Sequence, residues 1–146
     1  MADQETLLNL ADDEVAVATF LADNGGHLTR DDADPAVYWL TLRPSSAPSE
    51  TYYVRLAWTA YPHQPPSIKF ADTIGGSVAA TRAWPLIPGY RAPSFDICKP
   101  MSAEGYALHP EWRQGPDAWP TIGNPFVWVA EMLQFDLDNN YTGRAA

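Results

Sequence analysis

Apolar residues near the start of the chain recur with the period of an α-helix. Successive members of the set lie three or four residues apart and so share one helical face: Leu8, Ala11, Val15, Ala18 and Ala22. The acidic residues at positions 12–14 fall largely off that face. Asn24-Gly25-Gly26 is a strong stop signal, because both residue types tolerate positive φ. We predict a helix over Gln4–Asp23 with this apolar face.

Three later segments have the composition or the alternation of β-strands. Val37–Leu42 is rich in β-branched and aromatic residues, and Ser67–Ala71 fits a short strand. Residues 51–60 alternate between two faces, and the apolar face carries Tyr52, Val54, Leu56, Trp58 and Ala60. Turn-forming residues separate these segments. We therefore predict an antiparallel meander after the first helix.

The segment between residues 84 and 124 is rich in proline. Seven prolines interrupt regular structure there, and three tryptophans indicate an ordered, packed segment. Asn124-Pro125 then favours a helix start, with asparagine as N-cap and proline in the first turn. The apolar stripe of that helix is Phe126, Val129, Leu133 and Leu137. The pattern predicts an α+β fold in a single domain over residues 1–146.

The chain has a formal net charge of −9, and the charge is unevenly distributed. Nine acidic residues and one arginine lie within the first 34 positions, so the acidity belongs to the N-terminal segment. Bulk electrostatics therefore argue against a nucleic-acid partner. No apolar run is long enough to cross a membrane, and the N-terminus lacks a signal-peptide pattern. We expect a cytoplasmic protein without a membrane partner.

Cys98 is the single cysteine, so neither an intrachain disulfide nor a cysteine-built metal site can form. His27, His63 and His109 are scattered, and no glycine-rich phosphate loop occurs. We therefore predict no metal and no cofactor. A lone cysteine is often a small buried hydrophobic residue, and an active thiol is the alternative.

The most informative segment runs from Tyr61 to Phe70 and reads YPHQPPSIKF. Pro62, Pro65 and Pro66 fix φ and remove backbone donors, which makes a stiff loop between strands. Tyr61 and Phe70 can pack at its two ends. A structural role is enough to explain this loop, and nothing in its composition requires a catalytic role.

The same segment resembles the YPxxPP signature of the ubiquitin-conjugating (E2, or UBC) family. Ile97-Cys98 is similar to the pair at the active site of that family, and Trp119-Pro120 resembles the stretch before its crossover helix. The order of elements agrees over residues 4 to 138. The resemblance implies a UBC-like fold in which Cys98 carries a ubiquitin-like modifier as a thioester. It also implies an E1-like activating enzyme and a protein target as partners.

The chain departs from the family pattern before the cysteine. Residues 87–94 contain neither the histidine nor the asparagine of the usual His-Pro-Asn motif, whose asparagine is the expected oxyanion donor. His109 is the best substitute, as a base or as a donor, and a surface histidine is an equal alternative. Tyr106 and Asp117 are weaker candidates. Lys99 would favour a thiolate at Cys98 and is also a self-modification risk.

Other interpretations stay open at this point. A catalytically silent E2 variant would keep the fold and bind a ubiquitin-like protein or a partner enzyme. A cysteine hydrolase built from Cys98 and His109 is less favoured, because their spacing matches no familiar pattern. The acidic first helix predicts a basic face on the activating enzyme. By analogy, a minimal bacterial-type E2 would belong to a ubiquitin-like conjugation pathway. Some pathways of this kind act in antiviral defence against phage.

Overall fold

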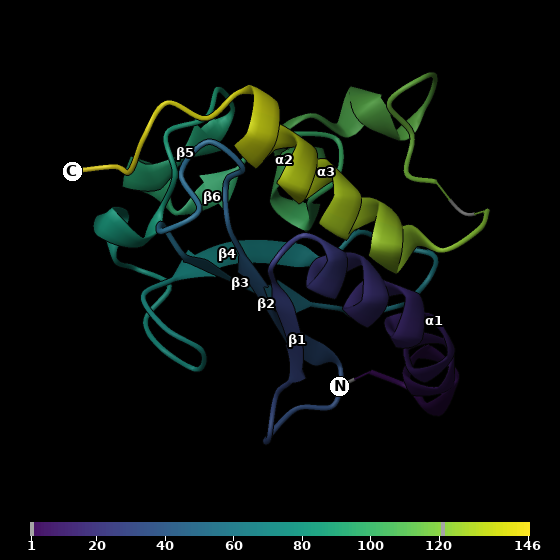
Figure 1. Ribbon diagram of the computed structural model, residues 1–146. Helices are drawn as coiled ribbons and strands as arrows, with labels where there is room; N and C mark the ends of the chain where they lie inside the picture. The colour runs from purple at the N-terminus through teal and green to yellow at the C-terminus, as the bar shows by residue number, and fades with distance from the viewer. Residues whose placement is uncertain (1, 121) are drawn as a thin grey trace.

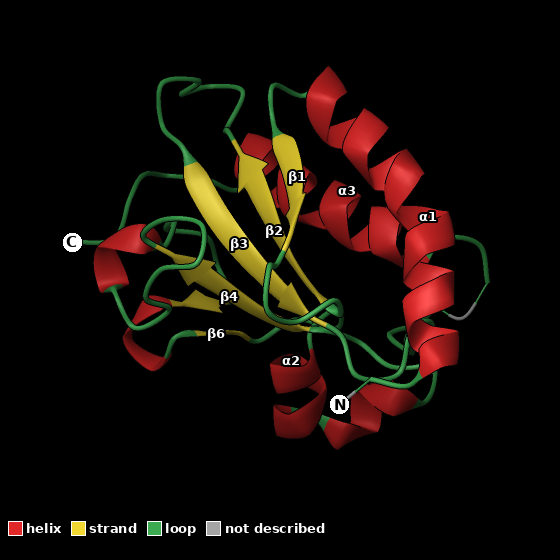
Figure 2. Ribbon diagram, turned by 90° about the horizontal axis from the view of Figure 1, so that it is seen from below, coloured by secondary structure: helices red, strands yellow, loops and turns green. Residues whose placement is uncertain are grey.

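Two long helices pack on one face of a four-stranded antiparallel sheet in the computed structural model, which describes residues 2–120 and 122–146 (Figure 1). The helices are α1 (Gln4–Asp23) and α3 (Pro125–Asn139). The strands follow one another in space as in sequence: β1 (His27–Arg30), β2 (Val37–Leu42), β3 (Tyr52–Ala57) and β4 (Ser67–Ala71). Figure 2 shows both helices on the same side of this sheet. The α+β class and the meander are therefore confirmed.

The predicted bounds of α1, β2 and β4 and the predicted start of α3 are confirmed, whereas β3 is shorter than predicted. The alternation over residues 51–60 is correct, but β3 ends at Ala57. Beyond that residue one further bond continues the pairing, in which the Trp58 N–H donates to the Ala36 carbonyl at 3.0 Å, and the chain then bends toward the proline loop. A short polar strand, β1, pairs with β2 at the edge of the sheet and was not predicted from the sequence.

The predicted apolar face of α1 is wrong. Leu8 and Val15 are 59% and 68% exposed, whereas Leu10, Val17 and Leu21 are fully buried. The predicted stripe contains three alanines, which remove little apolar area from water when they are buried. The opposite stripe buries larger side chains, each worth about 1.5–3 kcal/mol. The larger area decides how α1 is rotated.

The start of α3 confirms the predicted cap. The Asn124 side chain accepts a hydrogen bond from the Val127 N–H at 2.9 Å, and Pro125 occupies the first turn. The predicted apolar stripe lies in the core: Phe126, Val129, Leu133 and Leu137 are all fully buried.

The proline-rich stretch contains more regular structure than its composition indicated. A two-stranded hairpin forms from β5 (Tyr90–Arg91) and β6 (Asp96–Ile97), and a short helix, α2 (Ala103–Leu108), follows it. The Ser102 side chain caps α2 by accepting from the Gly105 N–H at 2.9 Å. Three 3₁₀ helices complete the stretch: Thr81–Ala83, Ala92–Ser94 and Pro110–Arg113.

The proline loop is tied to both long helices through Tyr61. The Tyr61 N–H donates to the Thr6 hydroxyl on α1 at 3.2 Å. The Tyr61 hydroxyl donates to the Asp13 carboxylate and accepts from the Phe126 N–H of α3 at 3.2 Å. Its ring packs edge-on against Trp58 at 4.7 Å. Burial is the main cause that raises the pKa of Tyr61, so its hydroxyl stays protonated and can donate.

The other residues of the motif also have structural partners. The Trp119 indole N–H donates to the Pro62 carbonyl at 2.8 Å, which joins the loop to the chain before α3. Phe70, at the other end of the motif, is fully buried and lies 5.1 Å from the Trp84 ring. Pro66 is buried, while Pro65 and Pro120 are half-buried.

We predict that Tyr61→Phe lowers the free energy of unfolding by about 1–3 kcal/mol, because the Asp13 carboxylate and the Phe126 N–H lose the hydroxyl that they bind. Urea unfolding followed by circular dichroism measures the loss. Tyr53→Phe on β3 is the matched control, since the Tyr53 hydroxyl has no hydrogen bond within the described part of the chain. Equal losses in the two variants would contradict the role given to Tyr61.

Candidate functional site

Cys98 follows directly on β6, at the open end of the β5–β6 hairpin. Its N–H donates to the Gly89 carbonyl at 2.8 Å, which continues the pairing of Tyr90 with Ile97. Ile97 is fully buried, whereas Cys98 is half-buried and carries a free thiol. The alternation along the strand therefore turns Ile97 inward and leaves Cys98 only partly buried.

Both charged neighbours of Cys98 have partners of opposite charge. Asp96 accepts two hydrogen bonds from the Arg91 guanidinium, each 2.7 Å long. This pairing raises the pKa of Arg91. Lys99 reaches α3, where its Nζ lies 3.0 and 3.1 Å from the two carboxylate oxygens of Asp136. The structure thus directs both charges into ion pairs.

Asp136 is the centre of a buried polar cluster that the analysis of the sequence missed. It is 1% exposed, and it accepts from the Tyr90 hydroxyl at 2.7 Å and from the Asn140 amide at 3.0 Å. A buried carboxylate is costly unless such partners satisfy it. Burial, followed by the charge of Asp136, raises the pKa of Tyr90 well above its usual value, so this hydroxyl remains a donor.

The signal for this cluster was present in the helical pattern. Asp136 lies three residues after Leu133 and one before Leu137, within the apolar face of α3. A charged residue at such a position needs a buried partner. The sequence alone does not name that partner, because Tyr90 and Lys99 lie far away along the chain.

Gly89 gives the Lys99 side chain its path to Asp136. A Cβ atom at Gly89 would lie 3.2 Å from Cγ and 3.3 Å from Cε of Lys99. Gly89 also has φ of +89°, which disfavours any L side chain. Beyond this point the Lys99 ammonium lies 5.7 Å from the centroid of the Tyr90 ring. The alkyl chain of Lys99 therefore covers the position beside the Cys98 backbone.

His109 is engaged away from the sulfur. It forms the C-cap of α2, its Nδ1 lies 3.0 Å from the Glu111 carboxylate, and its ring stacks on Trp112 at 4.2 Å. Within residues 2–120 and 122–146, no hydrogen bond joins His109 to Cys98. The Tyr106 hydroxyl donates to the carbonyls of Pro100 and Asp117, which gives this buried ring a structural role.

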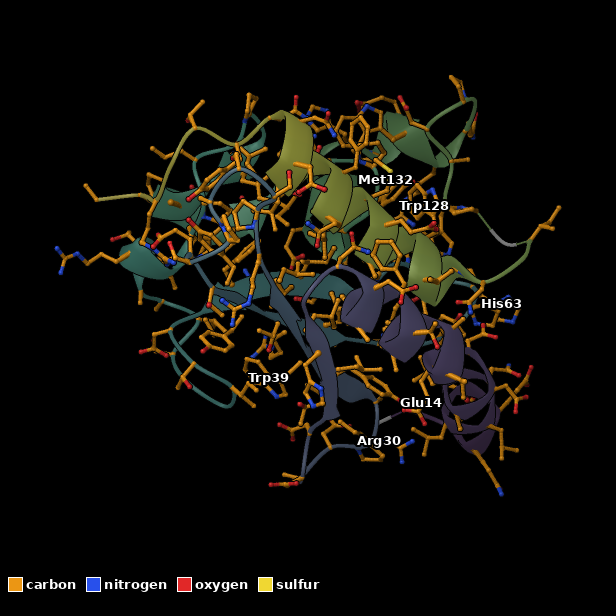
Figure 3. All side chains as sticks on the ribbon, in the orientation of Figure 1. Glu14, Arg30, Trp39, His63, Trp128 and Met132 are labelled. Carbon is orange, nitrogen blue, oxygen red and sulfur yellow. The ribbon has the colours of Figure 1, made fainter. Side chains whose placement is uncertain are left out.

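Two open pockets flank the segment after Cys98. One, of about 240 Å³, lies between the proline loop and the chain before α3, and its lining includes His63, Gln64, Arg113 and Trp119. The other, also about 240 Å³, is lined by Lys99, Pro100, Met101, Trp128 and Met132. Figure 3 shows Trp128 and Met132 on the side of α3 away from α1. The second pocket begins at the residue next to the thiol and offers an apolar surface.

Metal and membrane signatures are absent from the described part of the chain. No group of three histidine, cysteine or acidic residues is placed to hold a metal ion there. None of the described helices combines the length and the apolar character needed to cross a bilayer. Comparison with protein-family models, curated proteins and solved structures finds no match to this chain.

We predict that Gly89→Ala destabilises the protein more than Gly115→Ala does. Both glycines have positive φ, +89° and +87°, but a Cβ at Gly115 would meet open space. The control should therefore lose about 1–2 kcal/mol for the backbone conformation alone. Gly89→Ala should lose more, because its methyl group also crowds Lys99. Urea unfolding of both variants measures the difference, and equal losses would show that Lys99 does not pack on Gly89.

Proposed function

We propose that the protein is an E2-like conjugating enzyme with a UBC-like fold, in which Cys98 carries a ubiquitin-like protein as a thioester. The observation that carries this proposal is the half-buried free cysteine at the end of the β5–β6 hairpin. The helix–meander–helix order and the anchored proline loop agree with the resemblance in the sequence. The pathway is proposed to be bacterial, with a role in antiviral defence by analogy alone.

The reaction needs a thiolate that attacks an activated acyl group and later leaves from it. Sulfur suits both steps, because it is nucleophilic and leaves readily. The chain has no glycine-rich phosphate loop, so an E1-like partner supplies the activated modifier. An amine of the protein target then attacks the thioester. The apolar pocket beside Lys99 offers a surface for the carried protein.

His109 is the candidate base or oxyanion donor in this proposal. Its Nδ1 is paired with Glu111, which leaves Nε2 to serve as a base or as an oxyanion donor, and no hydrogen bond joins it to Cys98 within the described part of the chain. Residues 87–94 contain no asparagine to supply an amide donor. We therefore assign the thiol chemistry to Cys98 alone.

We predict that the wild-type protein forms an adduct with its modifier that is cleaved by thiols, in the presence of the cognate activating enzyme and ATP. Cys98→Ser should give a thiol-resistant oxygen ester, and Cys98→Ala should give no adduct. Gel electrophoresis with and without reductant separates these products. His109→Gln should still form the thioester. The proposal fails if the wild-type protein yields no reducible adduct.

A silent module that binds a ubiquitin-like protein is the second candidate. The observation that favours it is the absence of histidine and asparagine from residues 87–94, ahead of Cys98. Iodoacetamide labelling of the native protein separates the two candidates. Cys98 that reacts only after unfolding would support the silent module, and rapid labelling of the folded protein would support the enzyme.

The partner that loads Cys98 is proposed to contact the exposed side of α1. Leu8 and Val15 are exposed there beside the acidic Asp12. The neighbouring Asp13 and Glu14 have other roles, since Asp13 accepts from Tyr61 and Glu14 pairs with Arg30, as Figure 3 shows. An apolar patch with acidic neighbours suits a partner surface with apolar and basic residues.

We predict that Val15→Asp and Asp12→Lys each raise the KM for loading by the activating enzyme by about tenfold, while thermal stability stays unchanged. Both positions are exposed, so neither substitution disturbs the core. Glu131→Lys, at an exposed position on α3, is the control for the change of charge. Unaltered loading kinetics in both α1 variants would place the partner elsewhere.

A further inference from the structure

The Lys99 side chain is the nearest amine to Cys98 along the chain, and the fold holds its ammonium at Asp136 on α3. Gly89 leaves room for the alkyl chain, and the ring of Tyr90 lies beside the ammonium at 5.7 Å. The ammonium ends at Asp136, with both carboxylate oxygens within 3.1 Å. The lysine side chain itself is 27% exposed, whereas that of Asp136 is 2% exposed. The restraint therefore comes from a buried, rigidly held carboxylate.

A free lysine at position 99 would endanger a thioester at position 98. Lysine has a flexible four-carbon stem, so an unrestrained ammonium next in sequence can turn back toward the acyl group. Proximity of this kind greatly accelerates attack, because the reaction becomes intramolecular. The nitrogen also has to leave both carboxylate oxygens of Asp136 before it can attack. Asp136 thus fixes the position of the amine.

We propose that Asp136 is a positioning residue that withholds Lys99 from Cys98 and so prevents the carried acyl group from migrating onto the chain itself. This inference rests on the proposed function, since it concerns the same thioester. Tyr90 and Asn140 take part by fixing the carboxylate with hydrogen bonds of 2.7 and 3.0 Å.

The prevented step is an S-to-N acyl transfer. The neutral Lys99 amine would attack the thioester carbonyl carbon, a C–N bond would form and the C–S bond would break. The electron pair of the C–S bond would leave with sulfur as the thiolate. The proton lost by nitrogen would pass to solvent or to that thiolate. The product is an amide on Lys99, which neither thiols nor hydroxylamine cleave.

A small thioester tests the inference without the activating enzyme or the modifier. S-phenyl thioacetate acetylates an accessible Cys98 by thioester exchange, and mass spectrometry after hydroxylamine treatment counts only the acetyl groups held as amides. Peptide mapping then assigns the amide to Lys99. Cys98→Ala measures direct acetylation of Lys99 by the reagent, which is subtracted.

We predict that Asp136→Asn increases migration from Cys98 to Lys99 by about tenfold or more over the wild-type protein, because the charged hydrogen-bond partner of the lysine is lost. Asp136→Glu should restore part of the protection. Asp136→Asn combined with Lys99→Arg should show none, since arginine cannot accept the acyl group. Circular dichroism checks that each variant is folded.

A second measurement on the wild-type protein covers the case in which Asp136→Asn fails to fold. The acetyl group should stay on Cys98 in the native state and migrate once urea unfolds the chain. Equal migration in native and unfolded protein, or no gain in a folded Asp136→Asn variant, overturns the proposed role of Asp136. Failure to acetylate native Cys98 at all instead overturns the proposed function, so the two failures are distinguishable.

Discussion

The hydroxyl and the backbone of Tyr61 join three elements that lie far apart in the sequence. Its N–H binds Thr6 on α1, and its hydroxyl binds Asp13 on α1 and the first turn of α3. The proline loop holds this residue at the end of β3, where few backbone conformations are open to it. The sheet, both helices and the chain that returns through Trp119 depend on this junction. The motif that identified the resemblance is therefore primarily structural.

The charged residues beside Cys98 each form an ion pair with another residue. Two charged residues of opposite sign, Asp96 and Lys99, lie beside Cys98 in the sequence, and Lys99 was expected to favour a thiolate. The fold gives each of them its own partner, Arg91 in the hairpin and Asp136 on α3. A charge committed to an ion pair acts mainly on its partner, and buried partners also fix its direction. The local electrostatics at Cys98 are thus set by long-range contacts.

The rotation of α1 determines where both its acidic residues and its exposed apolar residues lie. Rotation of this helix buries Leu10 and Val17 and leaves Leu8 and Val15 in solvent beside Asp12. Asp13 and Glu14 fall between the two faces, where they bind Tyr61 and Arg30. Part of the negative charge therefore stabilises the fold, and the remainder is free for partners.

Local signals in the sequence determined the bounds of α1, β2 and β4 and the start of α3, because caps, turns and period are properties of neighbouring residues. The Asn124 cap and the stripe from Phe126 to Leu137 belong to this class. Tertiary structure decided which face of α1 is buried, because two apolar stripes compete and the larger wins. It also decided the partner of Lys99, since Asp136 and Gly89 meet it only after the sheet and α3 have packed. Contacts between distant residues depend on the three-dimensional path of the chain, and no local pattern encodes that path.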